Sequence, residues 1–196
     1  MARGDTREKI VRTAMELFWA KGYGSTSIAD ILSRTQLNSG SLYHFFPAKQ
    51  DLLVAVLDAY RDGIAPMLLD PAWRGVDDPV ERVFSLLATY RAALVSTDCT
   101  YGCPIGSLAL ELHEADPVVR ERLAQNFAAW VEAVRGCYEE AEARFPAGTD
   151  FHALAELTLT IMEGGVMQAR THRNVGHFER GVEQLRRHIS LLTQAH

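Results

Sequence analysis

Apolar residues recur every three or four positions along nearly the whole chain, and this spacing constrains the fold more than any other feature. A helix brings such positions onto one face, whereas a strand would need strict alternation, which the sequence lacks. Glycine and proline divide the pattern into about nine helical segments. The sequence therefore predicts an all-α protein, with a small N-terminal three-helix domain followed by a C-terminal helical bundle.

The charge of the chain is unevenly distributed. The net charge is −5, but residues 1–60 hold seven Lys/Arg against six Asp/Glu, and the remainder holds thirteen against nineteen. An acidic body can still bind DNA if the N-terminal cations gather on one face. The composition alone therefore neither indicates nor excludes a nucleic-acid partner.

Nothing in the sequence points to a membrane or to export. No apolar run reaches the roughly 18 residues that a membrane span needs, and the first residues are polar, unlike a secretory signal. Three cysteines, Cys99, Cys103 and Cys137, cannot all pair within one chain. We expect a cytoplasmic protein with reduced thiols and no membrane partner.

Two short helices near the N-terminus have the outline of a helix-turn-helix. The first is expected to begin at a Thr26 cap, and the second to run from an Asn38 cap to Phe46 after a short break. Leu42 and Phe46 lie four residues apart and can anchor the second helix to the apolar face of the helix before them. Gly40 lets the backbone approach DNA closely.

The polar residues of this region suit a DNA contact. Asn, Ser, Tyr and His side chains in 38–44 have hydrogen-bonding groups for base edges and phosphate oxygens. Thr26 and Ser27 offer backbone N–H groups and hydroxyls at a helix N-terminus, where a phosphate binds. Lys49 also lies at a helix N-terminus, where the helix dipole disfavours a cation unless an anion is close.

Residues 5 to about 60 closely resemble the DNA-binding domain of the TetR family. The shared positions, in order, are Ile10, Ala14, Leu17, Phe18, Gly22, Tyr23, Thr26, Ile28, Ile31, Gly40, Leu42, Tyr43, Phe46, Lys49 and Leu52. The resemblance implies phosphate contacts from Thr26, Tyr43 and Lys49, and base or backbone contacts from Asn38, Ser39, Ser41 and His44. The turn reads Thr35-Gln36-Leu37-Asn38 instead of the common Ala-Gly-Val-Ser, so the operator sequence does not follow from it.

Each of these residues also has a purely structural interpretation. Tyr43 and His44 can be half-buried core residues, Thr26 and Asn38 ordinary helix caps, and Lys49 a solvated lysine. The joint pattern, rather than any one residue, favours the DNA-binding interpretation. We place the DNA-binding domain in residues 1–62.

The resemblance implies that residues 63–196 form a helical body that dimerises through its last two helices and holds a ligand pocket. Apolar residues from Phe178 to Leu192 recur at steps of 4, 3, 4 and 3, a seam typical of coiled coils. The adjacent glycines Gly164 and Gly165 lie within an expected helix, where close approach of a partner helix would explain them. The alternative is a seam that packs inside its own subunit.

The ligand pocket is expected among the middle helices. Its candidate lining residues are Tyr90, Cys103, Phe127, Trp130, Met162 and Met167. Cys103 precedes Pro104 at an expected helix N-terminus, where a thiol pKa falls and reactivity rises. The segment from Gly102 to Glu111 is similar to one found in some TetR-type regulators of multidrug or electrophile response. Plain core packing is the alternative for the whole set, including a small buried cysteine.

Other classes of protein fit the sequence less well. Cys103 and His113 lie about 15 Å apart along a helix, too far for a catalytic pair, and the chain has no phosphate-binding loop. Cys99 and Cys103 lack nearby ligands for a metal. A helical adaptor would leave the polar helix at 38–46 unexplained. The sequence thus predicts a regulator, most simply a repressor, that binds double-stranded operator DNA as a homodimer and responds to a small-molecule inducer, without enzymatic activity, metal or cofactor.

Overall fold

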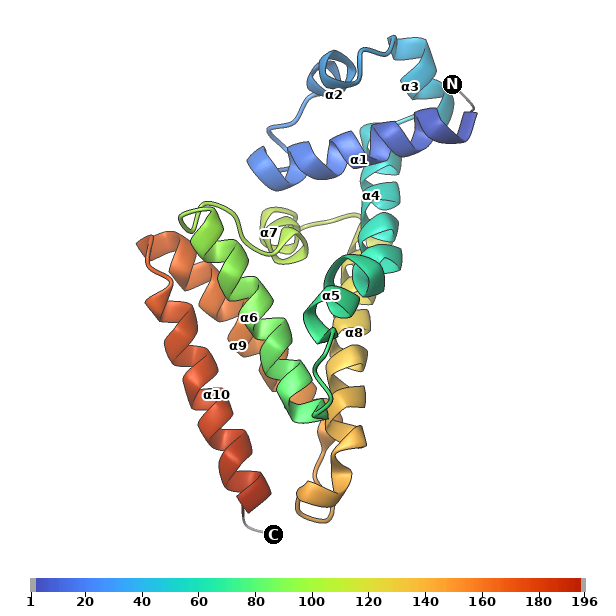
Figure 1. The fold of residues 1–196 in the computed structure, drawn as a ribbon. Helices are drawn as coiled ribbons and strands as arrows, with labels where there is room; N and C mark the ends of the chain where they lie inside the picture. Colours follow the sequence, from blue (N-terminus) through green and yellow to red (C-terminus); the bar gives the residue numbers. More distant parts are fainter. Residues whose placement is uncertain (1–2, 195–196) are drawn as a thin grey trace. The chain divides into compact units, whose positions relative to one another are not determined.

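The computed structural model describes residues 3–194, and this part of the chain is all-α without strands (Figure 1). Its helices are α1 (Arg3–Lys21), α2 (Ile28–Thr35), α3 (Ser39–Phe45), α4 (Lys49–Ile64), α5 (Asp70–Trp73), α6 (Pro79–Ser96), α7 (Pro104–Glu111), α8 (Pro117–Glu140), α9 (Phe151–His172) and α10 (Gly176–Gln194). A π-helical turn at Ala65–Leu69 follows α4, and a 3-10 turn at Glu142–Arg144 follows α8. The predicted fold class is confirmed.

The chain forms two compact units. The first unit comprises Met1–Asp62 with Pro104–Asn126, and the second comprises Gly63–Cys103 with Phe127–His196. One break between units falls after Asp62, where the sequence placed a boundary. The segment Pro104–Asn126 belongs to the first unit, although sequence position alone assigned it to the C-terminal body.

The first unit is organised around α1. Ile10, Ala14 and Phe18 are buried on the apolar face of α1, and this helix contacts α2, α3 and α7. Ile31 of α2 and Leu42 of α3 are both fully buried. Helices of seven or eight residues are marginal alone in water, so α2 and α3 depend on this packing for their existence.

The second unit is built on α6, α9 and α10, which contact one another (Figure 1). Tyr138 of α8 is fully buried in this core, and its hydroxyl lies 3.0 Å from the hydroxyl oxygen of Thr158 in α9. Gly165 permits the close approach of α9 and α10, because a Cβ there would lie 3.0 Å from the ring of Phe178. The packing of α9 against α10 within one subunit therefore explains why residue 165 is a glycine.

The apolar seam of α10 faces the core of its own chain. Phe178, Leu185 and Ile189 are at most 2% exposed, and Val182 and Leu192 pack against the same core. The expectation that this seam presents itself to a second subunit is therefore wrong for its buried residues. A coiled-coil spacing identifies a buried face but not the chain that buries it.

Replacing Leu42 with alanine should destabilise the protein by about 2–5 kcal/mol, because Leu42 is fully buried and its loss leaves a cavity between α3 and α1. Chemical denaturation followed by circular dichroism measures this change. The neighbouring Tyr43→Ala is the control, since its exposed ring should contribute little to stability. Equal stability of the Leu42→Ala protein and wild type would contradict the anchoring of α3 by this residue.

Candidate functional site

The helix α3 is fixed at both ends. The Asn38 side chain caps its first turn by accepting a hydrogen bond from the backbone N–H of Ser41 at 2.8 Å. Leu42 is fully buried, and Phe46 just beyond the helix is 2% exposed. Both predicted anchors and the predicted cap are thereby confirmed, and they hold one face of α3 against the unit.

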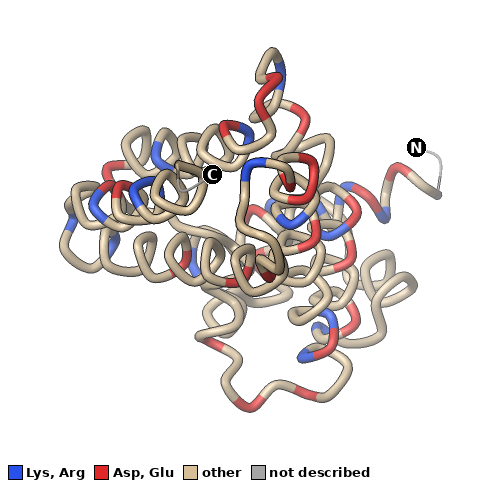
Figure 2. The backbone as a smooth tube through the Cα atoms, turned by 90° about the horizontal axis from the view of Figure 1, so that it is seen from below, with Lys and Arg blue, Asp and Glu red and all other residues tan. Residues whose placement is uncertain are grey.

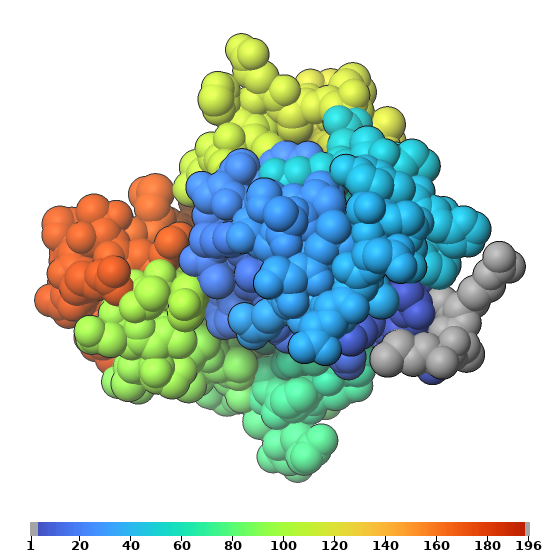
Figure 3. Space-filling view, turned by 90° about the horizontal axis from the view of Figure 1, so that it is seen from above, coloured from blue at the N-terminus to red at the C-terminus, as the bar shows by residue number. Residues whose placement is uncertain are grey.

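The opposite face of α3 is exposed. Ser39, Tyr43 and His44 all lie on the surface, with Tyr43 48% exposed. Figure 3 shows α2 and α3, in the middle blues, as one continuous part of the molecular surface. The alternative that Tyr43 and His44 belong to the core is wrong. Ser41 is half-buried on the same helix.

The start of α2 differs from expectation by one residue. Thr26 is fully buried, and its hydroxyl donates a hydrogen bond to the Gly22 carbonyl at 2.7 Å, so the predicted phosphate contact from this hydroxyl is wrong for this structure. The cap is Ser27, whose Oγ accepts from the N–H of Asp30 while the Asp30 carboxylate accepts from the N–H of Ser27. Of two adjacent hydroxyls only one can cap, and the sequence does not tell which.

Lys49 is held inside the first unit. Its ammonium donates a hydrogen bond to the Tyr23 carbonyl at 2.6 Å and lies 4.2 Å from the centroid of the Tyr23 ring. Burial lowers the pKa of Lys49, although the charges of Glu111 and Asp30 oppose this. A lysine at a helix N-terminus thus has a partner within the protein, and its phosphate contact stays a prediction.

Two further cations of the first unit, Lys21 and Arg34, form ion pairs. Lys21 lies 2.9 Å from the Asp30 carboxylate, and Arg34 lies 3.5 Å from that of Glu16. Basic and acidic residues are interspersed along the helices rather than gathered into segments of one sign (Figure 2). The helix α3 itself, Ser39–Phe45, contains no Lys or Arg, so its exposed polar groups are neutral hydroxyl and imidazole side chains.

Sequence reasoning missed one residue of this unit, Glu111 at the end of α7, which contacts the start of the helix-turn-helix region. Its carboxylate accepts hydrogen bonds from the backbone N–H groups of Tyr23 and Gly24, at 2.9 and 2.5 Å. These donors lie in the turn between α1 and α2. Glu111 is 88 residues from Tyr23 in sequence, so no local pattern could have revealed the contact.

The second unit brings three predicted pocket residues together around an acidic group. Tyr90 is half-buried, and its pKa is raised well above the usual value by burial of its hydroxyl and by the charges of Cys103 and Glu163. Burial raises the pKa of Glu163, and a hydrogen bond from the Cys103 thiol partly offsets this shift. The Trp130 indole lies beside Tyr90. We call Tyr90, Cys103, Trp130 and Glu163 the polar cluster.

Two atoms of the polar cluster are buried without hydrogen-bond partners. One is Oε1 of Glu163, and the other is the indole Nε1 of Trp130, which lies outside hydrogen-bonding geometry to Tyr90. Trp130 itself is only 4% exposed. Buried polar atoms in native proteins nearly always have partners, so each exception requires an explanation.

The other predicted pocket residues lie in different surroundings. Met162 is fully buried in the core of the second unit, and Phe127 is half-buried. Met167 is 49% exposed, so the expectation that it lines an interior pocket is wrong. Met162 and Met167 lie five positions apart, so their side chains point about 140° apart around α9.

The cysteines are buried thiols rather than a disulfide or a metal site. Cys99, Cys103 and Cys137 are at most 7% exposed, and burial raises the pKa of Cys137 to about 11. Within residues 3–194, no three His, Cys, Asp or Glu side chains are grouped as metal ligands. No helix of the described chain is both long and apolar enough to cross a membrane.

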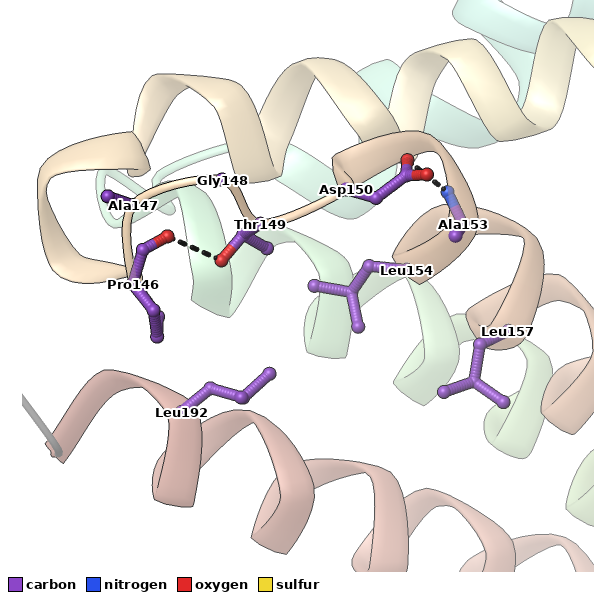
Figure 4. Close-up of a pocket in the computed structure, with 9 residues that line it drawn as sticks. All are labelled: Pro146, Ala147, Gly148, Thr149, Asp150, Ala153, Leu154, Leu157 and Leu192. Atoms are coloured by element: carbon purple, nitrogen blue, oxygen red, sulfur yellow. Dashed lines mark hydrogen bonds between the residues drawn. The ribbon is translucent and has the colours of Figure 1, made fainter.

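An open apolar cleft of about 420 Å³ lies between the loop before α9, the start of α9 and the end of α10 (Figure 4). Leu154 and Leu157 of α9 and Leu192 of α10 point into it, and the 146–150 loop closes one end. This cleft is separate from the polar cluster and was not predicted from the sequence.

An all-α protein that exposes the polar face of a short, firmly anchored third helix has the architecture of a helix-turn-helix DNA-binding protein. Comparison with known proteins specifies the class further. Residues 10–56 match the family model of bacterial regulatory proteins of the tetR family, and residues 79–185 match the tetracyclin repressor-like C-terminal domain. The chain belongs to the TetR family of transcriptional regulators.

Individual relatives agree with this assignment. The HTH-type transcriptional regulator YxaF of Bacillus subtilis is 31% identical, over 88% of this chain and 89% of YxaF. The HTH-type transcriptional repressor DhaR of a Mycobacterium species is 26% identical, over 89% of this chain and 87% of DhaR. A crystal structure of regulatory protein TetR from Rhodobacter sphaeroides superposes with a TM-score of 0.82 and 26% identity, covering 92% of this chain and 97% of that one. These proteins are regulators and not enzymes.

Replacing Tyr43 with alanine should weaken DNA binding roughly two- to tenfold per subunit, because the exposed hydroxyl would lose one phosphate hydrogen bond. The loss should be similar for specific and unrelated duplexes, since phosphates carry no sequence. Fluorescence anisotropy with both duplexes measures it, with the exposed α6 variant Val95→Ala as control. A Tyr43→Ala protein that binds both duplexes as tightly as wild type would exclude a phosphate contact from this residue.

Proposed function

We propose that the protein is a homodimeric repressor that a small-molecule inducer releases from its operator. Residues 1–62 read DNA, and residues 63–196 bind the inducer and dimerise. The observation that carries this proposal is the polar cluster in the second unit. The relative DhaR is named a repressor, which supports repression as the direction of control.

The polar cluster is poorly suited to a purely structural role. Leaving a buried polar atom without a partner costs about 1–3 kcal/mol, and the cluster has two such atoms, Oε1 of Glu163 and Nε1 of Trp130. A molecule that donates to the carboxylate and accepts from the indole would satisfy both. Specific ligand sites combine apolar walls with a few such convergent polar groups.

The carboxyl group of Glu163 limits the classes of compound that would bind in the polar cluster. Among apolar, cationic and electrophilic compounds, Glu163 favours an apolar molecule that carries an amine or another hydrogen-bond donor. An electrophile would instead react with Cys103, whose thiol is hydrogen-bonded to Glu163. The two kinds of inducer depend on different residues and can be separated by substitution.

Contacts between α8 and α4 offer one route from inducer to DNA. The Asn126 side chain donates to the Leu57 carbonyl at 3.0 Å, and Arg122 lies 3.0 Å from the Asp58 carboxylate. The helix α8 continues beyond Asn126 into the second unit, where it includes Trp130. A shift of α8 caused by inducer binding would therefore move α4, and with it the separation of the two α3 helices of a dimer, about 34–36 Å on B-DNA.

The direct test is an electrophoretic shift assay with the DNA upstream of the protein's own gene, with and without a panel of apolar, cationic and electrophilic compounds. An effective compound should lower DNA affinity by about 5- to 150-fold, the usual range of coupling between two sites. For an amine, Glu163→Gln and Trp130→Ala should remove most of the response. For an electrophile, Cys103→Ser should remove it.

Phe127→Ala is a further variant of the same test, since this half-buried ring was expected in the pocket. The Val95→Ala protein, which changes an exposed side chain of α6, is again the control. A compound that releases DNA equally from wild type and from the Glu163, Trp130, Cys103 and Phe127 variants would place the inducer site elsewhere. Failure of the wild type to bind any upstream fragment would contradict the regulator role itself.

The dimer is proposed through outward faces of α9 and α10, since the seam of α10 is internal. Leu157, Gly164 and Met167 recur along one side of α9, and the two large side chains are 40% and 49% exposed. A Cβ added to Gly164 would meet no atom within 4 Å, so this glycine leaves open space for a neighbouring helix. On α10, Leu191 is 61% exposed.

The double variant Leu157→Asp with Met167→Asp should shift the protein toward monomers, because charges without partners would be buried in the interface. Sedimentation velocity measures the mass, and circular dichroism checks the fold. Val95→Asp, which changes an exposed valine of α6, is the matched control and should remain dimeric. A folded double variant that still sediments as a dimer would exclude this face of α9.

A further inference from the structure

The turn between α1 and α2 closes on a carboxylate from a distant helix. Glu111, the last residue of α7, accepts the backbone N–H groups of Tyr23 and Gly24 at 2.9 and 2.5 Å. Lys49, at the start of α4, donates to the carbonyl of the same Tyr23 at 2.6 Å. The turn that leads into the helix-turn-helix is therefore tied to both α4 and α7.

Two glycines make room for this carboxylate. A Cβ at Gly22 would lie 2.8 Å from Oε2 of Glu111, and a Cβ at Gly24 would lie 2.9 Å from Oε1. Gly22 also has a φ of +85°, which side-chain-bearing residues rarely adopt. Gly24 has no such backbone constraint, so only the position of the Glu111 side chain makes a side chain at Gly24 unfavourable.

The other end of α7 follows directly on the polar cluster. The helix begins at Pro104, so no residue separates it from Cys103, whose thiol is hydrogen-bonded to Glu163. Cys103 belongs to the second unit, and Pro104 begins a segment of the first. A helix of eight residues is only about 12 Å long, so α7 is a short direct connection between Cys103 and Glu111.

We propose that Glu111 is a positioning residue whose hydrogen bonds make the α1–α2 turn of the DNA-reading unit move together with α7. Because α7 begins directly after Cys103, a displacement of Cys103 then moves this turn as well. This inference rests on the proposed function, in which the polar cluster is the inducer site. It adds a route through α7 to α1 and α2 that is independent of the route through α8 to α4. The Glu111 side chain is exposed, so its contacts contribute little to stability and mainly fix geometry.

The test displaces Cys103 by attaching a bulky group to its thiol. N-ethylmaleimide adds the thiol S–H across its carbon–carbon double bond and needs no other reactant. For each full-length protein, the affinity for the upstream DNA fragment is measured before and after alkylation, with intact mass confirming one adduct. The Cys103→Ser protein controls for reaction at Cys99 and Cys137. A Cys103→Phe substitution supplies the bulk genetically.

In wild type we expect alkylation to lower DNA affinity by about 5- to 150-fold. In Glu111→Ala the affinities before and after alkylation should agree within about twofold, because the turn no longer follows α7. Gly24→Ala should have the same effect, because its methyl group displaces the carboxylate without removing its charge. The double variant should behave like either single variant, as expected for two changes in one interaction. Glu114→Ala, which removes another exposed carboxylate near α7, should respond like wild type.

Hydrogen exchange gives a readout that a purely structural role would not change. Alkylation should speed exchange of the Tyr23 and Gly24 amides in wild type, whereas in Glu111→Ala these amides should exchange fast from the start. An equal loss of affinity in wild type and Glu111→Ala would overturn the coupling while leaving the proposed function intact. An unchanged affinity of alkylated wild type and of Cys103→Phe would also overturn it. Failure of unmodified wild type to bind DNA would contradict the proposed function instead.

Discussion

The DNA-reading unit depends on the packing of short helices against the apolar face of α1. Neither α2 nor α3 is long enough to be stable alone. Both depend on contact with α1, where Ile31 and Leu42 are fully buried. This packing also determines which side of α3 faces outward. The exposure of Tyr43 and His44 is thus a consequence of the burial of Leu42 and Phe46 on the opposite face of α3.

In the second unit, the most informative residues are instead polar groups that lie inside an apolar core. The Tyr138 hydroxyl forms a hydrogen bond with the Thr158 hydroxyl, as expected for a structural pair. Glu163 and Trp130 keep one polar atom each without a partner. The same core therefore contains both a satisfied polar pair and two buried polar atoms without partners.

Several sequence predictions failed for one shared reason: periodicity identifies a buried face without identifying what covers it. The seam from Phe178 to Leu192 has the spacing of a dimer interface, yet α6 and α9 of the same chain cover it. Likewise, adjacent hydroxyls at Thr26 and Ser27 are equally good caps in sequence, and only packing decides that Thr26 is buried.

The sequence by itself determined the helical fold, the helix-turn-helix, the anchors and cap of α3, and the family, because these depend on local spacing and on the order of residues along one segment. It also selected Tyr90, Cys103 and Trp130. Only the tertiary structure added Glu163 to them and brought Glu111 to the α1–α2 turn, since these contacts join residues that are far apart in the chain. The tertiary structure likewise assigned Pro104–Asn126 to the DNA-reading unit, because grouping by contact does not follow position along the chain.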